Sequence, residues 1–381
     1  MSAKGFSFSP DTLREIAQTA LNYANQQGAS ACEVDVSEGF GQTVSVRLDE
    51  VDTIEYNRDK GLGITTYIGQ QRGHANTSDF STEAIKATVD AALSIARFTA
   101  PDPFAGLAEP ELFARDMPDL DLHHPWRPSV EESIELARQC EQAAFTVSDQ
   151  ITNSEGASIS SQESHFVLAN SAGFIGGFAS SRHSVSCSVI AGEDEAMQRE
   201  FWYDTRRDVR DLSAVTDVGR IAGERALARV GARKIPTCEV PVLFESPIAA
   251  SLIGHLVQAV SGGALYRRSS FLLDSLGKQV MSPIMHISER PHVSKAFGST
   301  WFDDEGVATK TRDIVSDGVL QGYFLSSYSA RKLGMQTTAN AGGAHNLYVR
   351  PGEHDLAGLM REMGRGLLVT ETFSLSGATA A

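Results

Sequence analysis

His255 is the histidine whose neighbours say most about metal chemistry. It lies in the apolar stretch Ala250–Val260, whose spacing predicts a helix. A zinc-protease helix of the zincin type carries a second histidine and a glutamate on one face, to bind Zn²⁺ and to activate water. Here the next residue is Leu256, and the positions four and five further on are Ala259 and Val260. We therefore expect a histidine that a local hydrogen bond satisfies, with metal ligation as the alternative.

Acidic and basic groups elsewhere offer further candidates. Asp303–Gly306 holds three carboxylates before a glycine, and it could be a metal site, a general base or a solvated turn. Arg267–Arg268 and Asp274–Lys278 could bind a carboxylate or a partner's acidic groups, with simple surface solvation as the alternative. Gly342–Asn346 predicts a tight turn at which the backbone could approach a ligand. The candidates for substrate or partner contact are Arg267, Asp303, Asn340, Gly343 and His345.

Other catalytic signatures are missing from the sequence. Neither the phosphate-binding pattern GxxxxGK[ST] nor the nucleophile pattern GxSxG occurs. Gly61–Gly63 lacks the third glycine of a dinucleotide-binding loop, and His123–His124 has no third metal ligand in view. No serine, cysteine or threonine can be paired with a base from the sequence alone. We therefore assign no catalytic residue, no metal ligand and no cofactor to this chain.

Composition and charge exclude several classes of protein. The 381 residues carry 33 Lys and Arg against 48 Asp and Glu, a net charge of −15, and 41% of them are hydrophobic. This apolar content excludes a disordered chain, and the negative charge disfavours nucleic-acid binding. Four scattered cysteines favour buried free thiols in a cytoplasmic protein. With no signal-peptide pattern and no apolar run of about 18 residues, we expect a cytoplasmic protein without a membrane partner.

Hydrophobic periodicity predicts the elements that must position these residues. Helical spacing covers Thr12–Gln27, Ala84–Phe98, Val130–Val147, Val215–Val230, Ser246–Ser261 and Leu356–Val369. Alternation predicts antiparallel strands at Cys32–Val36, Thr43–Leu48, Leu62–Tyr67, Gln71–Ser78, Ala157–Ser161 and His165–Ala169. Gly39–Gly41 reads as a turn between two of these strands. Arg312–Ser316 and Val319–Ser326 predict a hairpin, because Asp317–Gly318 suits the positive φ angles of a tight turn.

This order of elements predicts an α+β fold of successive helix–antiparallel-sheet–helix units rather than a doubly wound parallel sheet. We place the units at residues 1–116, 117–234 and 235–381. The proline-rich stretch 101–125 reads as a linker. Strand-rich units of this kind could recognise extended peptides by pairing at a sheet edge.

Five long segments match a known family in the same order along the chain. They are Asp49–Ser81, Ala96–Ala108, Ile253–Val280 (IGHLVQAVSGGALYRRSSFLLDSLGKQV), Phe302–Gly334 and Ala341–Val349 (AGGAHNLYV). Together they resemble the TldD/PmbA family, and specifically its PmbA (TldE) branch, which also carries the older label modulator of DNA gyrase. The resemblance extends from about Ala31 to about Phe373, nearly the whole chain.

The resemblance implies a PmbA/TldD-like fold and a part in proteolysis. TldD and PmbA (TldE) are homologous subunits that associate into a cytoplasmic zinc-dependent protease acting on unfolded or extended peptides. In TldD a helix carries HExxxH, which supplies two zinc ligands and the catalytic glutamate. This sequence is similar only at His255, because Leu256 and Val260 stand at the other two positions. The resemblance therefore implies a non-catalytic subunit with a vestigial His255, and zinc only in a TldD-like partner.

The end of the sequence departs from the family pattern. The family normally continues beyond Glu371–Phe373 with a glycine-rich segment and further strands, and in TldD the remaining metal ligand, a cysteine, lies there. Ser374–Ala381 does not resemble that segment. We therefore expect a truncated C-terminal domain with unpaired sheet edges.

Two functional hypotheses follow. The first is a PmbA/TldE-like subunit of a heterodimeric metallopeptidase, which shapes the chamber or holds the substrate while a TldD-like partner carries zinc; the chain alone could form a homodimer. The second is a stand-alone peptide-binding or regulatory protein without protease activity. Co-purification of a chain with HExxxH favours the first. A DNA- or gyrase-binding regulator is disfavoured by the net charge of −15.

Overall fold

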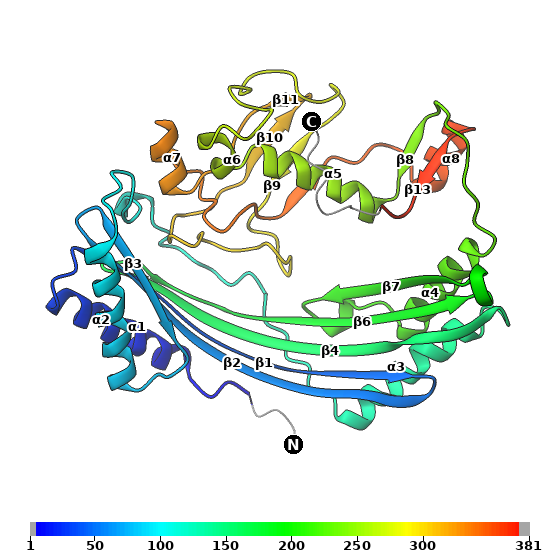
Figure 1. Ribbon diagram of the computed structural model, residues 1–381, viewed down its shortest axis with the longest axis horizontal. Helices are drawn as coiled ribbons and strands as arrows, with labels where there is room; N and C mark the ends of the chain where they lie inside the picture. The colour runs from blue at the N-terminus through cyan, green and yellow to red at the C-terminus, as the bar shows by residue number, and fades with distance from the viewer. Residues whose placement is uncertain (1–4, 373–381) are drawn as a thin grey trace. The chain divides into compact units, whose positions relative to one another are not determined.

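The structure is a computed structural model and describes residues 5–372 (Figure 1). The chain divides into two units. The first comprises Met1–Ala232 and Pro291–Thr309, and the second comprises Arg233–Arg290 and Lys310–Ala381. The truncation expected at Ser374–Ala381 lies outside the described residues.

One antiparallel sheet forms the centre of the first unit. Its strand order is β3-β2-β1-β4-β6-β7, and β5 pairs with β4. The strands are β1 (Ala31–Arg47), β2 (Glu50–Ile68), β3 (Gln71–Thr77), β4 (Ile151–Asn170), β5 (Ile175–Gly176), β6 (Ala179–Ala191) and β7 (Gln198–Arg206). Antiparallel strands with flanking helices confirm the predicted α+β class.

The central strands are longer than their alternation predicted. The predicted turn at Gly39–Gly41 is wrong, because β1 runs through it without a break. Gly41 lies opposite Gln162 of β4, and the Gln162 side chain fills the space that a Cβ on residue 41 would need. This glycine therefore marks a close approach between two strands. Likewise Ala157–Ser161 and His165–Ala169 are parts of the single strand β4.

The sheet also joins the first two predicted units. β1 pairs with β4 from Glu33 opposite Asn170 to Val46 opposite Ala157, so the strands on both sides of residue 116 belong to one sheet. The segment between them does run as an irregular connection, with only a short 3₁₀ turn at Pro110–Leu112 and an isolated bridge at Phe113.

Two pairs of helices pack on the two ends of one sheet face. The helices are α1 (Pro10–Gln26), α2 (Thr82–Phe98), α3 (Val130–Phe145) and α4 (Val215–Arg229). Val34 and Val36 of β1 share a core with α1 and α2, and Val46 of the same strand shares a core with α3 and α4. Side chains two residues apart point to the same side of a strand. Both cores therefore lie on one face, one at each end of the long strands (Figure 1).

Between these two cores the same face becomes polar. Glu38 and Phe40 of β1 lie opposite His165 and Glu163 of β4, and all four side chains are buried. The segment that precedes α1 covers them, since the Ser7 N–H donates to the Glu38 carboxylate at 2.9 Å. A charged strip thus separates two apolar cores on one continuous sheet.

The second unit holds short elements. They are β8 (Val242–Phe244), β9 (Ile287–Glu289), β10 (Arg312–Ser316), β11 (Val319–Leu320), β12 (Leu347–Val349), β13 (Leu367–Val369), α5 (Ser246–Ala259), α6 (Gly262–Tyr266), α7 (Ser327–Leu333) and α8 (Leu356–Met363). One sheet has the order β11-β10-β9-β12, and β13 pairs with β8 in parallel. The hairpin around Asp317 (φ 49°) and Gly318 (φ 76°) is confirmed, but its second strand, predicted to reach Ser326, ends at Leu320.

The helix predicted over Leu356–Val369 is too long. It ends at Met363, and Gly364 takes a φ of 62°, which ends the helix. Leu367–Val369 then forms β13 beside β8. The apolar residues of this segment therefore serve two elements, a difference that helical spacing alone does not reveal.

The cysteines only partly follow the prediction. Cys32, Cys140 and Cys187 are buried free thiols, but Cys238 is exposed, so its predicted burial is wrong. Within residues 5–372 no helix combines the length and the apolar character that crossing a bilayer requires.

Candidate functional site

His255 lies on α5 with its side chain exposed. The expected local hydrogen bond is wrong: within the described residues its imidazole has no hydrogen-bond partner, and its exposure leaves it to solvent. Leu256 and Val260 are instead buried, at 7% and 0% exposure, in the core of the second unit. Val260 caps the end of α5 with a φ of −103°.

These residues do not fit a zinc ion. Leu256 and Val260 carry only hydrocarbon side chains, which cannot ligate a metal, and both are committed to the core. A single exposed imidazole leaves three of zinc's four usual positions unfilled. Among the side chains that the structure describes, no three of His, Cys, Asp or Glu are grouped so that they could hold a metal.

Three of the predicted contact residues come together around a buried glutamate that the sequence did not single out. Glu289 of β9 is 1% exposed. Its Oε1 accepts hydrogen bonds at 2.8 Å from both the Asn340 side chain and the His345 backbone N–H. Its Oε2 accepts one from Arg312 Nε at 2.8 Å, and Arg312 Nη2 donates to Asn340 Oδ1 at 2.9 Å. The carboxylate therefore holds the loop from residue 339 to 346 against the sheet of the second unit.

The backbone of this loop is fixed at further points. Asn340 Nδ2 also donates to the carbonyl of Gly343 at 3.0 Å, and the His345 ring Nε2 lies 2.8 Å from the carbonyl of Ala339. Ala339 and Gly343 adopt φ angles of 57° and 125°. Only glycine takes the Gly343 conformation without strain, which accounts for the glycine turn seen in the sequence. The arrangement is a preformed loop in which the Asn340 and His345 side chains serve the fold.

The other two predicted residues lie elsewhere. Arg267 follows α6, is exposed, and stacks on Tyr266 with its guanidinium carbon 5.3 Å from the ring centre. Asp303 belongs to the first unit and is 3% exposed. Its Oδ1 accepts the backbone N–H groups of Glu305 and Val307, both at 3.0 Å. The carboxylate thus closes a turn, and its contact with a substrate or partner stays a prediction.

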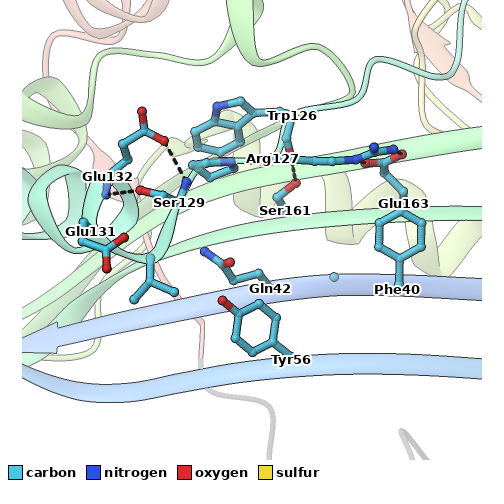
Figure 2. Close-up of a pocket in the computed structure, with 13 residues that line it drawn as sticks. Phe40, Gln42, Tyr56, Trp126, Arg127, Ser129, Glu131, Glu132, Ser161 and Glu163 are labelled. Atoms are coloured by element: carbon cyan, nitrogen blue, oxygen red, sulfur yellow. Dashed lines mark hydrogen bonds and ion pairs between the residues drawn. The ribbon is translucent and has the colours of Figure 1, made fainter. Parts of the chain in front are cut away.

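The first unit carries a cavity of about 380 Å³ over the charged strip of the sheet. Figure 2 shows Phe40, Tyr56 and Trp126 around it, with Arg127 directed to Glu163. One ion pair of this lining is already formed. Arg127 donates to Glu163 through Nε at 2.8 Å and Nη2 at 2.9 Å, so these two charges balance each other before any ligand binds.

Glu163 is the most strongly perturbed carboxylate of this cavity. Burial alone would raise its pKa, but hydrogen bonds from His123 and Arg127 outweigh burial and hold the pKa at about 2. His123 Nε2 lies 3.0 Å from Glu163 Oε2. The sequence showed no partner for His123–His124. The structure places the Glu163 carboxylate, 40 residues further along the chain, beside His123. In the sequence, the feature that could have revealed Glu163 is its charge at a position of β4 where the alternating pattern places buried residues.

The sequence matches family models over most of its length. Three domain models of the PmbA/TldA metallopeptidases match: domain 1 at residues 32–96, the central domain at 123–230 and the C-terminal domain at 237–380. The chain is similar to the metalloprotease PmbA of Escherichia coli O157:H7, with 47% identity over 94% of this chain and 80% of that protein. It is also similar to a metalloprotease PmbA homologue of Haemophilus influenzae, with 46% identity over 94% of this chain and 80% of that protein.

More distant relatives include the other branch and solved structures. A metalloprotease TldD homologue of Haemophilus influenzae is 24% identical over 75% of this chain and 61% of its own length. A modulator of DNA gyrase from Bacteroides thetaiotaomicron matches with a TM-score of 0.90 and 27% identity, over 95% of this chain and 82% of that one. TldE from Thermococcus kodakarensis shares the fold, with a TM-score of 0.77 and 20% identity over 93% and 82%. With both the sequence and the fold in agreement, this chain belongs to the PmbA/TldD family of metallopeptidase homologues.

Proposed function

We propose that this chain is a PmbA/TldE-like subunit of a cytoplasmic metallopeptidase that acts on unfolded or extended peptides. In this proposal a TldD-like homologous subunit holds the zinc ion and performs the hydrolysis. The chain itself contributes structure and substrate contact and has no zinc of its own. The relatives named metalloproteases support the reaction class.

One observation carries the division of labour. Leu256 and Val260 lie one and five residues after His255, where the HExxxH motif has its glutamate and its second histidine. Both side chains are packed in the core. Leucine and valine neither ligate a metal nor transfer a proton. In the proposed complex the metal and the general base therefore come from the TldD-like subunit.

The test combines metal analysis with peptidase assays on three samples. These are this chain alone, a TldD-like subunit with HExxxH alone, and the two mixed in equal amounts. We expect near-stoichiometric zinc in the TldD-like subunit and cleavage of an unfolded peptide only in the mixture. A matched mixture with the partner's motif glutamate changed to glutamine should assemble but not cleave.

Two outcomes contradict the proposal. Zinc-dependent cleavage by this chain alone would mean that another set of residues forms a metal site. A mixture no more active than the TldD-like subunit, with no complex on size-exclusion chromatography, would favour a stand-alone peptide-binding protein instead.

A further inference from the structure

A second cavity of the first unit, of about 510 Å³, is lined by two arginines that have no carboxylate partner. The residues used in the argument are Gln162, Ser164, Ser180, Arg182, Arg207 and Phe297. The strand register explains their grouping. Gln162 of β4 lies opposite Arg182 of β6, and Ser164 lies opposite Ser180. Since these positions are two residues apart on each strand, all four side chains emerge from one side of the sheet.

Arg207, directly after β7, is nearly buried, at 8% exposure. Its Nε, Nη1 and Nη2 donate to the backbone carbonyls of Ala296, Ser181 and Phe297 at 3.3, 3.2 and 2.9 Å. These contacts use three of the five N–H groups of a guanidinium and leave two. The acceptors are neutral, so the positive charge is not compensated. Burial, followed by the positive charge of Arg182, lowers the pKa of Arg207.

The Arg182 side chain is exposed and makes no hydrogen bond or ion pair with the described residues. It lies over the Phe297 ring, 5.4 Å from the guanidinium carbon to the ring centre. Arg207 lies 5.1 Å from the same centre. Stacking on an aromatic ring holds a guanidinium in place and leaves its in-plane N–H groups available for a carboxylate. Phe297 thus orders two like charges beside one cavity.

The burial of Arg207 without an acid is the main argument. Three less buried arginines, Arg58, Arg127 and Arg312, each bind a buried glutamate, namely Glu38, Glu163 and Glu289. In a chain with a net charge of −15, two neighbouring arginines without an acid form a local positive site. Bringing two like charges together is unfavourable unless an anion lies between or beside them. An anionic ligand would therefore supply the negative charge that Arg182 and Arg207 lack.

We propose that this cavity binds a carboxylate group of an extended peptide, with Arg182 and Arg207 as the charged donors and Ser164, Ser180 and Gln162 as polar neighbours. The carboxylate can be the peptide's C-terminus or an acidic side chain, because both present the same planar anion to a guanidinium. The proposal rests on the proposed function, in which the chain handles peptides. A dianion such as phosphate suits the site less, since the net charge of −15 repels it more strongly than a monoanion. The cavity also has the size of a ligand site rather than that of a single ion.

Fluorescence anisotropy on the full chain alone tests the proposal. The probes are three fluorescein-labelled hexapeptides of serine and alanine: one with a free C-terminus, one with a C-terminal amide, and one amide with a central glutamate. We expect the free acid or the glutamate peptide to bind about tenfold more tightly than the plain amide. The better of the two identifies the source of the carboxylate.

Variants tie the binding to the cavity. Arg182→Gln removes an exposed charge that holds no other part of the fold, and it should weaken carboxylate binding about tenfold. Arg207→Lys, which keeps the charge but not the fork of donors, should also weaken it. The matched control is Arg220→Gln, an exposed arginine on α4 paired with Asp217 and Glu224, which should leave binding unchanged.

Three results would overturn the proposal. They are equal affinity for the acid and amide peptides, no loss in Arg182→Gln, and displacement of the labelled peptide by inorganic phosphate at lower concentrations than by acetate. Absence of binding by all three peptides would overturn it as well. The measurement needs neither zinc nor a partner, so its failure is distinguishable from failure of the peptidase assay on the mixture.

Discussion

Glu38 of β1 and His165 of β4 face each other across the sheet, with Glu38 Oε2 3.4 Å from His165 Nε2. Both side chains are buried, and the Phe6 ring stacks on His165 with ring centres 3.9 Å apart. The pair lies between the two apolar cores of the first unit. A titratable pair therefore lies between the two aliphatic cores, where aromatic contacts of Phe6 with His165 and Phe40 cover the sheet.

Burial decides the charge state of this histidine. It lowers the pKa of His165, and the nearby Glu38 only partly offsets the effect. For His183, which is fully buried, burial again lowers the pKa, against a hydrogen bond to the carbonyl of His124. Both imidazoles are therefore favoured in the neutral form in the folded protein.

The first prediction is that the first unit loses stability as the pH falls below about 6.5, the usual pKa of histidine. Below that pH the unfolded chain binds protons that folded His165 and His183 resist, so protonation favours unfolding. Each histidine contributes a slope of at most about 1.4 kcal/mol per pH unit. Urea unfolding between pH 8 and 5.5 measures it, followed by tryptophan fluorescence, since Trp126, Trp202 and Trp301 all lie in the first unit.

A variant separates these histidines from the other titrating groups. His165→Gln should reduce the slope, because glutamine does not titrate in this range. The control is His354→Gln, because this exposed histidine belongs to the second unit and its replacement should leave the unfolding of the first unit unchanged. Equal slopes in wild type and His165→Gln would show that folding does not shift the pKa of His165.

The second prediction concerns Glu163, whose pKa is held at about 2 by His123 and Arg127 against the effect of burial. Because this pKa lies below the ordinary value of 4.5, Glu163 stabilises the fold at pH above 4.5, and the stabilisation is lost as the pH falls toward 2. Glu163→Gln should cost about 2–3 kcal/mol at pH 7, since it leaves Arg127 without its carboxylate. The difference from wild type should shrink between pH 4.5 and 3.

Chemical denaturation at pH 7, 4.5 and 3 checks this prediction. The matched control is Glu15→Gln on the exposed face of α1, which should change the unfolding free energy by less than about 0.5 kcal/mol. A constant difference between Glu163→Gln and wild type at all three pH values would show that the carboxylate acts by shape and not by charge.

Local periodicity predicted helices α1 to α5 and the turn of the hairpin to within a few residues, because both depend on neighbouring residues. Ser9 and Ser129 begin α1 and α3 by accepting backbone N–H groups, and Asp317 and Gly318 close the hairpin. The joined sheet was not predicted, since pairing of β1 with β4 depends on residues more than 100 positions apart. The hydrogen-bond cluster around Glu289 was not predicted either, because its partners Arg312, Asn340 and His345 are 23 to 56 positions away in the sequence.

The third prediction is that Glu289→Gln loosens the loop from residue 339 to 346. The change keeps the size of the side chain but removes the negative charge that Arg312 binds, and it leaves a nearly buried guanidinium without its counter-charge. The second unit should lose about 3 kcal/mol of stability. Hydrogen exchange should accelerate most in the loop, where the His345 N–H loses its carboxylate acceptor.

Hydrogen exchange followed by mass spectrometry reads out that loop directly. Glu353→Gln, an exposed carboxylate of the same unit, is the control and should leave the exchange unchanged. If Glu289→Gln exchanged like wild type in this loop, the remaining bond from Asn340 to the Gly343 carbonyl would be sufficient to hold it.

The fourth prediction separates His255 from its neighbour on α5. His255→Ala removes an exposed side chain without a recorded partner among residues 5–372, so stability should change by less than about 0.5 kcal/mol. Peptidase activity of the mixture with a TldD-like subunit should also stay unchanged.

Leu256→Ala instead leaves a cavity in the core of the second unit and should cost about 2–4 kcal/mol of stability. Thermal unfolding and the peptide assay measure both variants. A loss of zinc or activity in His255→Ala at unchanged stability would give this imidazole a direct role in the reaction, and the division of labour between the two subunits would then be wrong.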